Sequence, residues 1–344
     1  MVRCFGDNNN KQLGIGSGSG TASPTTPNGL SSVPVRSVAG GGRHTCAAPV
    51  SGGVLCWGEN NNKQSTGLPS DGVSQADPGS VAGLTGEFVQ VVGGDKHSCA
   101  VGRSGEVVCW GQNDSGECGV GVTGSIQAPG QVVGLASTVT KISSSFRHTC
   151  AVLGNGSVQC WGLNSQYPLG TGDFAIRTTA TTPSNLRSGV SVVDVATGND
   201  HTCLVYQDGM VQCVGQNDSG QMGQGTTSLS QITFVTVPLS AATAVAAGDD
   251  FTCAIVNLQT GVSCWGKGTS GQLGHGQFAN SPSPVAVQGL SGTIVGIAAG
   301  ENFACALNSD GAVRCWGDNA TKQLGSNGGS SAVAVLIGGL NLNS

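Results

Sequence analysis

A short sequence with two cysteines recurs along the chain, and it restricts the fold more than any other feature. Its clearest copy is residues 148–162, His-Thr-Cys-Ala-Val-Leu-Gly-Asn-Gly-Ser-Val-Gln-Cys-Trp-Gly. Two short apolar runs flank a turn that contains glycine, and this pattern predicts a β-hairpin. In the last copy, residues 309–311 (Ser-Asp-Gly) suit a three-residue loop that ends in a left-handed glycine. That loop places Cys305 opposite Cys315 and Ala304 opposite Trp316.

Twelve of the fourteen cysteines fall into pairs. In five pairs the two cysteines have the same separation as in residues 148–162, and in the sixth they are one residue further apart. The pairs are Cys46 with Cys56, Cys99 with Cys109, Cys150 with Cys160, Cys203 with Cys213, Cys253 with Cys264, and Cys305 with Cys315. Opposed Cα atoms of an antiparallel pair lie about 4.5–5.5 Å apart, within reach of a disulfide. We therefore predict six disulfides and an oxidising compartment, outside the cell or at its surface. Cys4 and Cys118 remain and are predicted to be free thiols.

The chain shows no secretory signal, although an exported protein is expected to carry one. Residues 2–6 already have the pattern of a strand. Three explanations stay open: a fragment, a mature form, or a different compartment.

The repeat has a period of 51–53 residues and its two halves differ in number. The second half occurs seven times, ending at Gly6, Gly58, Gly111, Gly162, Gly215, Gly266 and Gly317. The first half, with its own cysteine, occurs six times. Abundant glycine (58 residues) and about four short strands per period are typical of a β-propeller blade. We expect one all-β domain over residues 1–344, with an N-terminal half blade at 1–30. The closing strands are expected to be absent, because their cysteine would fall at roughly position 355.

The unit Ala-Gly-x-x-His-Thr-Cys-Ala, followed by Gly-x-Val-x-Cys-Trp-Gly-x-Asn-x-x-Gly-Gln-Leu-Gly, resembles the regulator of chromosome condensation repeat. The resemblance covers essentially the whole chain and implies a seven-bladed β-propeller, here with six full blades and a half blade. The chain departs from the usual pattern by carrying cysteine on both strands of the hairpin. It is therefore similar to a cysteine-rich branch of the family, which we expect to be exported.

The histidines and tryptophans of the repeat are more consistent with packing than with chemistry. His44, His97, His148 and His201 precede the first cysteine, and phenylalanine takes the same place in the last two copies, at residues 251 and 303. Phenylalanine cannot bind a metal, so we predict buried structural histidines and no metal site. By the hairpin register, His44 faces Gly58, which leaves room for the imidazole ring. Tryptophans recur at one repeat position and are expected to pack between blades.

Three other patterns are weak signals. Residues 14–20 are glycine-rich like a phosphate-binding loop, but no helical pattern follows them. Asp249 and Asp250 form an acidic pair in a turn, without a histidine or lysine at a matching position, and we expect them to be solvated. Four asparagines fit the glycosylation pattern, namely Asn113, Asn155, Asn217 and Asn319.

The function expected is a non-enzymatic scaffold that binds an unidentified protein partner as a monomer, without a cofactor. The loops between repeats vary, and those at residues 65–79 and 172–185 are among the expected contact loops. The net charge of −5 and the absence of basic runs argue against nucleic acid, and no apolar segment is long enough to insert in a membrane. The alternative, from the resemblance alone, is a guanine-nucleotide exchange factor for a small GTPase.

Overall fold

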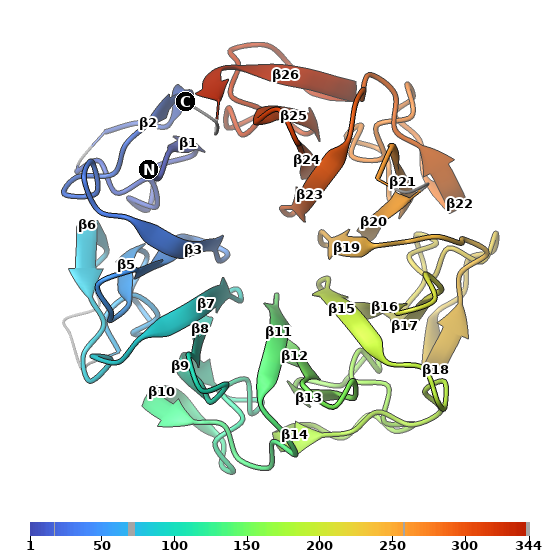
Figure 1. The fold of residues 1–344 in the computed structure, drawn as a ribbon, viewed down its shortest axis with the longest axis horizontal. Helices are drawn as coiled ribbons and strands as arrows, with labels where there is room; N and C mark the ends of the chain where they lie inside the picture. Colours follow the sequence, from blue (N-terminus) through green and yellow to red (C-terminus); the bar gives the residue numbers. More distant parts are fainter. Residues whose placement is uncertain (17, 68–72, 257–258, 342–344) are drawn as a thin grey trace. The chain divides into compact units, whose positions relative to one another are not determined.

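The computed structural model describes residues 1–16, 18–67, 73–256 and 259–341. These residues form β-strands joined by turns and loops, without a helix among them. The chain divides into two compact units. Figure 1 labels the strands of both units and colours the chain by sequence position. Unit 1 is Met1–Asn164 with Ala175–Thr182, and unit 2 is Ser165–Phe174 with Pro183–Ser344.

Unit 1 contains one two-stranded sheet, β1–β2, and three four-stranded sheets, each formed by consecutive strands. Its strands are β1 (Cys4–Gly6), β2 (Thr21–Thr25), β3 (Val35–Gly40), β4 (His44–Pro49), β5 (Leu55–Gly58), β6 (Gln75–Ser80), β7 (Phe88–Gly93), β8 (His97–Gly102), β9 (Val107–Asn113), β10 (Gly124–Gln131), β11 (Val139–Ser144), β12 (His148–Leu153), β13 (Val158–Gly162) and β14 (Arg177–Thr181). All neighbouring strands are antiparallel.

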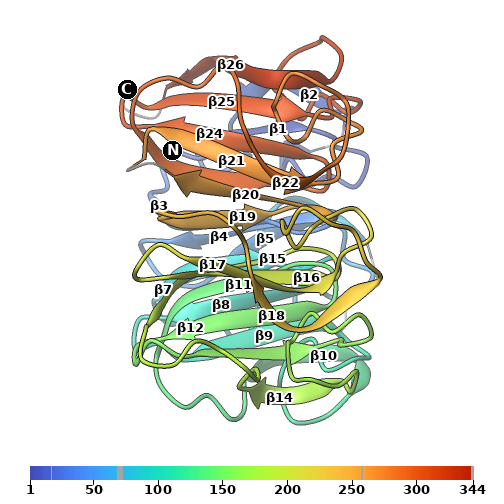
Figure 2. The same cartoon turned by 90° about the vertical axis from the view of Figure 1, so that its right-hand side faces the viewer.

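Unit 2 contains three four-stranded sheets of the same kind. Its strands are β15 (Val192–Thr197), β16 (His201–Tyr206), β17 (Val211–Gln216), β18 (Ser230–Thr236), β19 (Ala244–Ala247), β20 (Phe251–Val256), β21 (Gly261–Gly266), β22 (Ser281–Ala286), β23 (Ile294–Ala299), β24 (Phe303–Asn308), β25 (Ala312–Gly317) and β26 (Ser331–Asn341). In Figure 2, β24, β25 and β26 run side by side, as their pairing requires. We call each four-stranded sheet a blade and its strands A to D in chain order.

The predicted hairpin register is confirmed. Cys305 faces Cys315, Ala304 faces Trp316, and Gly311 has the left-handed φ of 84° that the three-residue loop needs. In every blade the two predicted cysteines are opposed, with Cα atoms 4.0–4.1 Å apart. This separation is slightly shorter than that expected from an unbridged pair.

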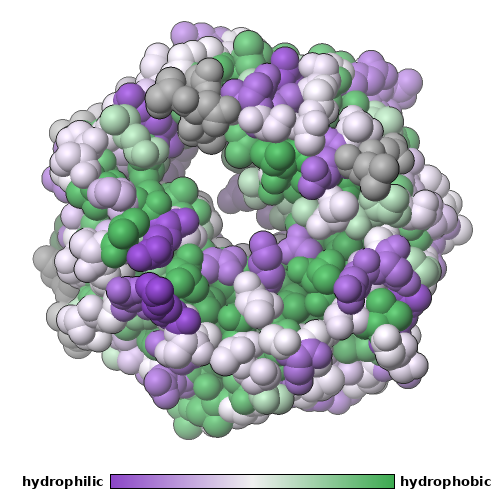
Figure 3. All heavy atoms as spheres, viewed as in Figure 1, coloured by the Kyte–Doolittle hydropathy of each residue, from purple (hydrophilic) through white to green (hydrophobic). Residues whose placement is uncertain are grey.

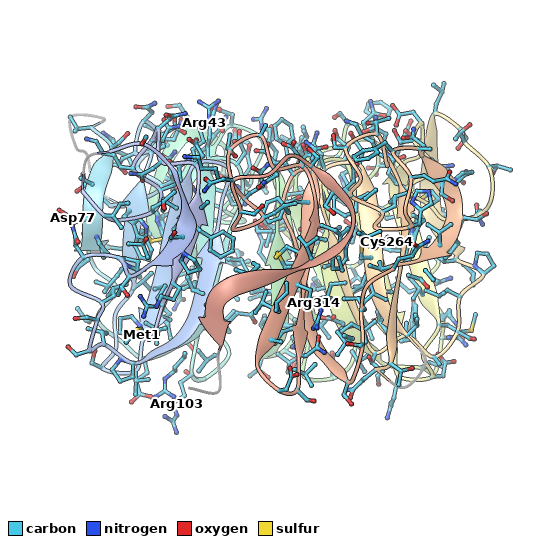
Figure 4. All side chains as sticks on the ribbon, turned by 90° about the horizontal axis from the view of Figure 1, so that it is seen from above. Met1, Arg43, Asp77, Arg103, Cys264 and Arg314 are labelled. Carbon is cyan, nitrogen blue, oxygen red and sulfur yellow. A yellow bond between two sulfur atoms is a disulfide. The ribbon has the colours of Figure 1, made fainter. Side chains whose placement is uncertain are left out.

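Each blade has one disulfide, which joins its B strand to its C strand. The bonds run from Cys46 to Cys56, Cys99 to Cys109, Cys150 to Cys160, Cys203 to Cys213, Cys253 to Cys264, and Cys305 to Cys315. The hairpin between β20 and β21, which is one residue longer than the others, still keeps its two cysteines in register. Its C-strand cysteine, Cys264, is labelled in Figure 4.

The core lies on the B and C strands, where the repeat places its cysteines and tryptophans. The B strands β8, β12, β16 and β20 are buried along their whole length. The D strands form the outer edges and are partly exposed. Pro129 and Pro284 lie on such edge strands, where a residue without an amide proton costs no ladder hydrogen bond.

Each blade has two different ends. The A–B turn and the C–D loop meet at one end, because Glu59 N donates to Arg43 O and Lys267 N donates to Asp250 O. We call this end the loop face, and the end with the B–C turn the hairpin face. Figure 4 shows both in unit 1, with Arg43 at the upper edge and Arg103, from a B–C turn, at the lower edge.

Candidate functional site

A polar network joins neighbouring blades beside the buried tryptophan. At the seam between the β3–β6 and β7–β10 blades, His44 Nε2 lies 2.8 Å from Ser98 Oγ on the next blade. Ser98 Oγ donates to the carbonyl oxygen of Gln64 at 3.2 Å, and Trp110 Nε1 donates to the same oxygen at 2.9 Å. Since Ser98 uses its proton on Gln64, His44 must donate from Nε2. The network therefore joins one B strand and one C–D loop to the B and C strands of the next blade.

The network recurs in both units. In unit 1, His97 Nε2 lies 3.1 Å from Thr149 Oγ1, and in unit 2 His201 Nε2 lies 2.8 Å from Thr252 Oγ1. The loop carbonyls that accept the indole protons belong to Gln12, Gln64, Glu117, Gln221 and Gln272. The Gln or Glu residue at this place of the C–D loop thus supplies a backbone acceptor for the tryptophan of the following blade.

One seam of unit 2 replaces both side chains of the histidine pair. Phe251 takes the histidine position on β20, and Ala304 takes the hydroxyl position on β24. Both are fully buried and belong to one hydrophobic cluster. The polar pair and the apolar pair are therefore alternative ways of filling the same space.

The histidines are held neutral by burial. Burial lowers the pKa of His44 and His97 to about 3 and that of His201 to about 4. His44 Nδ1 and His201 Nδ1 are buried without a hydrogen-bond partner. No group of three or more histidine, cysteine, aspartate or glutamate side chains in the described ranges could hold a metal ion. The buried positions and the phenylalanine replacement agree with a structural role.

The blade without a tryptophan fills its seam differently. Val214 stands at the tryptophan position on β17. A Cβ placed on Gly170, the loop glycine that faces an indole in other blades, would lie 2.6 Å from the ring of Phe234. Phe234, on β18, therefore replaces part of the missing indole. It precedes the residue that faces the C-strand cysteine, as Pro284 and Ala334 do in other blades, so its residue type and not its position is particular to this blade.

A buried ion pair distinguishes one loop of unit 1. Glu117 stands where five other repeats have glutamine, and its side chain is almost fully buried. Arg147, in the A–B turn of the next blade, donates from Nε to Glu117 Oε1 at 2.7 Å. Glu117 Oε2 also accepts the amide of Ser115 at 2.7 Å. The charge introduced by the glutamate is thus balanced across the seam.

The C-strand cysteines are placed as the repeat predicts, each within one blade. Cys160 lies on β13 opposite Cys150, Cys213 on β17 opposite Cys203, and Cys264 on β21 opposite Cys253. All six of these cysteines are fully buried, and their role is to hold two strands of a blade together. The structure therefore assigns them to the framework of the blades.

Two cysteines remain outside the disulfides. Cys4 is partly buried and Cys118 fully buried, both without a disulfide partner. Burial raises the pKa of Cys4 to about 12 and raises that of Cys118 well above its ordinary value, with the Glu117 carboxylate adding to the effect. Both thiols are therefore protonated at neutral pH.

The structure separates the four asparagines of the glycosylation pattern. Asn113, Asn217 and Asn319 are buried, and each donates its side-chain amide to a carbonyl oxygen of its own C–D loop. Each also accepts the amide of the residue five positions later. Asn155 alone among the four is exposed, in a B–C turn. The other three matches arise from the loop conformation.

Two weaker sequence signals are also explained by packing or pairing. Gly14 lies against the indole of Trp57, and a strand rather than a helix follows, so the glycine-rich run has a structural role; its residue 17 lies outside the described residues. The expectation that the acidic pair lacks a partner was wrong, because Lys267 Nζ lies 3.1 Å from Asp250 Oδ2. That lysine begins the C–D loop, at a repeat position where other blades have Glu59 and Gln112, so only this repeat carries a cation there.

The predicted contact loops lie on the loop face in part. Within residues 65–79, positions 68–72 lie outside the described residues, Ser65 is buried, and residues 75–79 belong to β6. Within residues 172–185, Phe174 is strongly exposed and β14 forms an outer strand. The described residues contain no helix of the length and apolarity that a membrane crossing needs.

Repeated four-stranded antiparallel blades, joined by tryptophan seams, define the protein as a β-propeller, here with six full blades and a half blade. The predicted fold class is confirmed. Residues 1–338 match the family described as RCC1-like domain, and the chain belongs to that family.

The relatives found by sequence and by structure agree with this assignment. The chain is 30% identical to the probable E3 ubiquitin-protein ligase HERC4 of Mus musculus, over 59% of this chain and 20% of HERC4. It is 29% identical to the ultraviolet-B receptor UVR8 of Arabidopsis thaliana, over 81% of this chain and 64% of UVR8. The chain thus spans about a fifth of HERC4 and under two thirds of UVR8.

Two solved structures have the same fold at low identity. Human WBSCR16 superposes with a TM-score of 0.88 at 20% identity, covering 98% of this chain and 93% of WBSCR16. Prp20p of Saccharomyces cerevisiae gives a TM-score of 0.84 at 20% identity, covering 97% of this chain and 85% of Prp20p.

Proposed function

We propose that residues 1–344 form one monomeric, non-enzymatic scaffold domain that recognises a protein partner through its loop face, outside the cell or at the cell surface. The observation that carries this proposal is a set of exposed apolar side chains on the loops of unit 2. Phe174, Leu229 and Phe278 are 72%, 88% and 55% exposed, although large apolar side chains are usually buried. These three residues lie on C–D loops, and exposed loop residues of a rigid scaffold are suited to contact a partner.

The framework of the blades supports a binding role rather than catalysis. The histidines, hydroxyl groups and tryptophans of the repeat are buried, and they bond to one another across the seams. The two thiols without a disulfide are protonated and therefore poor nucleophiles. What varies between repeats is the length and tip of the C–D loops, and this variation is where specificity is expected.

In unit 2, the acidic residues of the loop face indicate the kind of partner that this face would bind. Its A–B turns carry Asp200, Asp249, Asp250 and Glu301, and Lys267 pairs with Asp250. The raised pKa of Asp200 reflects burial and the nearby carboxylates of Asp250 and Asp218. A partner with basic and apolar side chains would complement this face. On the face drawn in Figure 3, hydrophobic and hydrophilic residues are interspersed in both units, and the colouring alone does not single out a contact surface.

The relatives support protein binding as a class of function. The structure of Prp20p was described together with its binding to Gsp1p and histones, and yeast RCC1 (Prp20) was solved bound to Kap60. The cystine pairs support an oxidising compartment, which distinguishes this chain from a nuclear role.

The alternative function is nucleotide exchange on a small GTPase, which family membership favours. A nucleotide-release assay with a candidate GTPase separates the two functions, and acceleration of release would overturn the scaffold proposal. For the scaffold itself, a photo-reactive phenylalanine analogue at position 278 should cross-link a discrete partner in extracts of the producing organism. The same analogue at position 310, on the hairpin face, is the matched control. Equal cross-linking from both positions, or none from position 278, would contradict the proposal.

A further inference from the structure

Two backbone bonds cover the outer edge of a D strand. The first runs from a glycine amide in the preceding C–D loop to a carbonyl oxygen of the D strand. The second runs from the amide two residues further along the D strand to the D–A linker of the preceding sheet. In the β23–β26 blade, Gly276 N donates to Ala332 O at 2.8 Å. Ala334 N donates to Gln288 O at 2.9 Å. These bonds use backbone groups that an edge strand would otherwise present to another chain.

The same cover recurs in both units. The glycine bond, with N···O distances of 2.7–3.1 Å, also runs from Gly16 to Ala76 O, from Gly121 to Thr178 O, and from Gly225 to Pro282 O. The second bond recurs from Ala180 N to Val133 O at 2.9 Å. In β6 and β22 the place of that amide is taken by Pro78 and Pro284, which have no amide proton to leave unpaired. These edges are therefore closed to a further strand.

The edge of β18 lacks this cover. Counted from the residue that faces the C-strand cysteine, Ile232 stands at the position of Ala332. Phe234 stands at the position of Ala334. Among the described residues, no loop amide donates to Ile232 O, and Phe234 N donates to no linker carbonyl. The ladder with β17 passes over residues 232–234 in a bulge, and β18 is the outermost strand of its blade in Figure 1. β18 therefore presents an acceptor and a donor to a further strand.

The exception has a physical cause in the seam. Val214 stands in place of a tryptophan, and the ring of Phe234 lies against Gly170 in the space of the missing indole. Phe234 is only 6% exposed, so its side chain is committed to the seam. The other D strands have alanine or proline at this position, and such small residues let the strand approach the preceding loop. The phenylalanine that fills the seam thus keeps β18 from its cover.

Apolar side chains flank the open edge. Ile232 is 49% exposed, and Leu229, directly before β18, is 88% exposed. Ser230 Oγ donates to Gln166 Oε1 at 2.8 Å, which holds the preceding loop and its exposed Phe174 beside the start of β18. β18 contains neither proline nor a charged residue, whereas β6, β10 and β22 contain proline. Proline and charge are the usual protection of an edge strand, so β18 is unprotected.

The charge of unit 2 selects the kind of segment that this edge would take. Unit 2 carries ten aspartates and glutamates against four lysines and arginines, a net charge of −6, whereas the net charge of unit 1 is +1. Two of the four cations of unit 2 are already paired, Lys267 with Asp250 and Arg187 with Asp208. Such an excess of negative charge attracts a basic segment and repels an acidic one.

We propose that the open edge of β18 binds an extended segment of the protein partner in which apolar and basic side chains alternate. This inference rests on the proposed function and specifies how the partner is held. One amide of the segment donates to Ile232 O, and one of its carbonyl oxygens accepts from Phe234 N, as Gly276 and Gln288 do on β26. The apolar side chains of the segment contact Leu229 and Ile232, and its basic side chains face the carboxylates of unit 2. Addition of a strand to a free sheet edge is an established mode of peptide recognition.

The probe is a fluorescein-labelled heptapeptide of alternating lysine and valine, titrated into the whole protein and followed by fluorescence anisotropy. We expect saturable binding that weakens as salt is added, and no binding of the matching glutamate–valine peptide. Two further peptides keep the charge and carry N-methyl groups on the valine amides or on the lysine amides. At least one of the two should bind about tenfold more weakly, because one edge of the peptide must supply the donor to β18. Full affinity of both methylated peptides would overturn the proposal.

The edge itself is tested by a matched pair of protein variants. Ile232→Pro copies Pro282, which stands at the same repeat position on β22, so the fold tolerates the change. It should weaken binding of the probe about tenfold, because it removes an outward amide and an exposed apolar side chain. Thr178→Pro makes the same change on the covered edge of β14 and should bind the probe like the wild type. Equal losses in the two variants would contradict the assignment to β18.

Amide hydrogen exchange, measured by nuclear magnetic resonance, locates the probe. Saturating probe should slow exchange at Phe234 at least about tenfold and leave Ala334, which is already bonded, unchanged. Unchanged exchange at Phe234 would overturn the proposal, and so would sedimentation of the free protein as a dimer, which would assign the edge to a second copy. The cross-link at position 278 tests the proposed function separately. A partner captured there, together with a probe that does not protect Phe234, would refute the strand edge alone.

Discussion

Removal of the Ser98 hydroxyl should destabilise the fold by about 2 kcal/mol. In Ser98→Ala, the buried Nε2 proton of His44 loses its acceptor at 2.8 Å, and a buried unpaired donor costs about 1–3 kcal/mol. The carbonyl of Gln64 keeps its bond from Trp110 at 2.9 Å, so little is added on that side. For 344 residues the entropy of unfolding is about 0.7 kcal/mol/K, and the melting temperature should fall by about 3 °C.

The control for this prediction is already present in the chain. The double variant His44→Phe with Ser98→Ala copies the Phe251 and Ala304 pair, in which the ring is fully buried. It should regain most of the loss, with a coupling energy of about 1–2 kcal/mol in the double-mutant cycle. Melting is followed by circular dichroism with the disulfides intact. If Ser98→Ala melts like the wild type, or if the two changes simply add, the account of the seams is wrong.

Three further predictions concern other buried or exposed groups. Acid should destabilise the fold: burial, aided by the Arg147 cation, lowers the pKa of His97 from 6.5 to about 3, so the unfolded chain binds a proton that the folded chain does not. This contribution is complete above pH 6.5 and is lost as the pH falls from there towards the folded-state pKa; melting temperatures that stay constant between about pH 7 and about pH 4 would contradict it. Arg147→Ala should cost about 3 kcal/mol in urea denaturation because it leaves the Glu117 charge buried, whereas Glu117→Gln with Arg147→Ala should recover stability; a neutral single variant would refute the ion pair. Expression in a glycosylating host should modify Asn155 and none of the three buried asparagines, and glycopeptide mapping that finds Asn113 occupied would show that its loop is open.

The blades could be predicted from the sequence because each depends on local and periodic features. The three-residue loop at Gly311 sets the register of its hairpin, and that register determines which cysteines oppose each other. Because successive side chains of a strand point to opposite faces of the sheet, the tryptophan then lies on the face opposite to the cysteine. Such relations lie within one repeat and need no knowledge of neighbouring blades.

The seams could be predicted only in part, because they join residues about 50 positions apart. The histidines and tryptophans are recognisable as packing residues, but their shared acceptor is a backbone carbonyl, which has no sequence signal. The replacement of a histidine and a hydroxyl residue by Phe251 and Ala304 can be recognised in the sequence only if the histidine position of one repeat is compared with the hydroxyl position of the next repeat. Phe234 and Lys267 stand at repeat positions that carry other residue types in the other blades, so their contacts with Gly170 and Asp250 required the structure.

The most direct test of the whole account is peptide mapping of the protein without reduction, after its free thiols have been alkylated in denaturant, which exposes the buried Cys118. The account predicts six disulfides, each within one blade, with the alkylating group on Cys4 and Cys118 alone. Disulfides that join different blades would contradict an architecture with one disulfide within each blade. Alkylation of the twelve paired cysteines would contradict both that architecture and the oxidising compartment inferred from it.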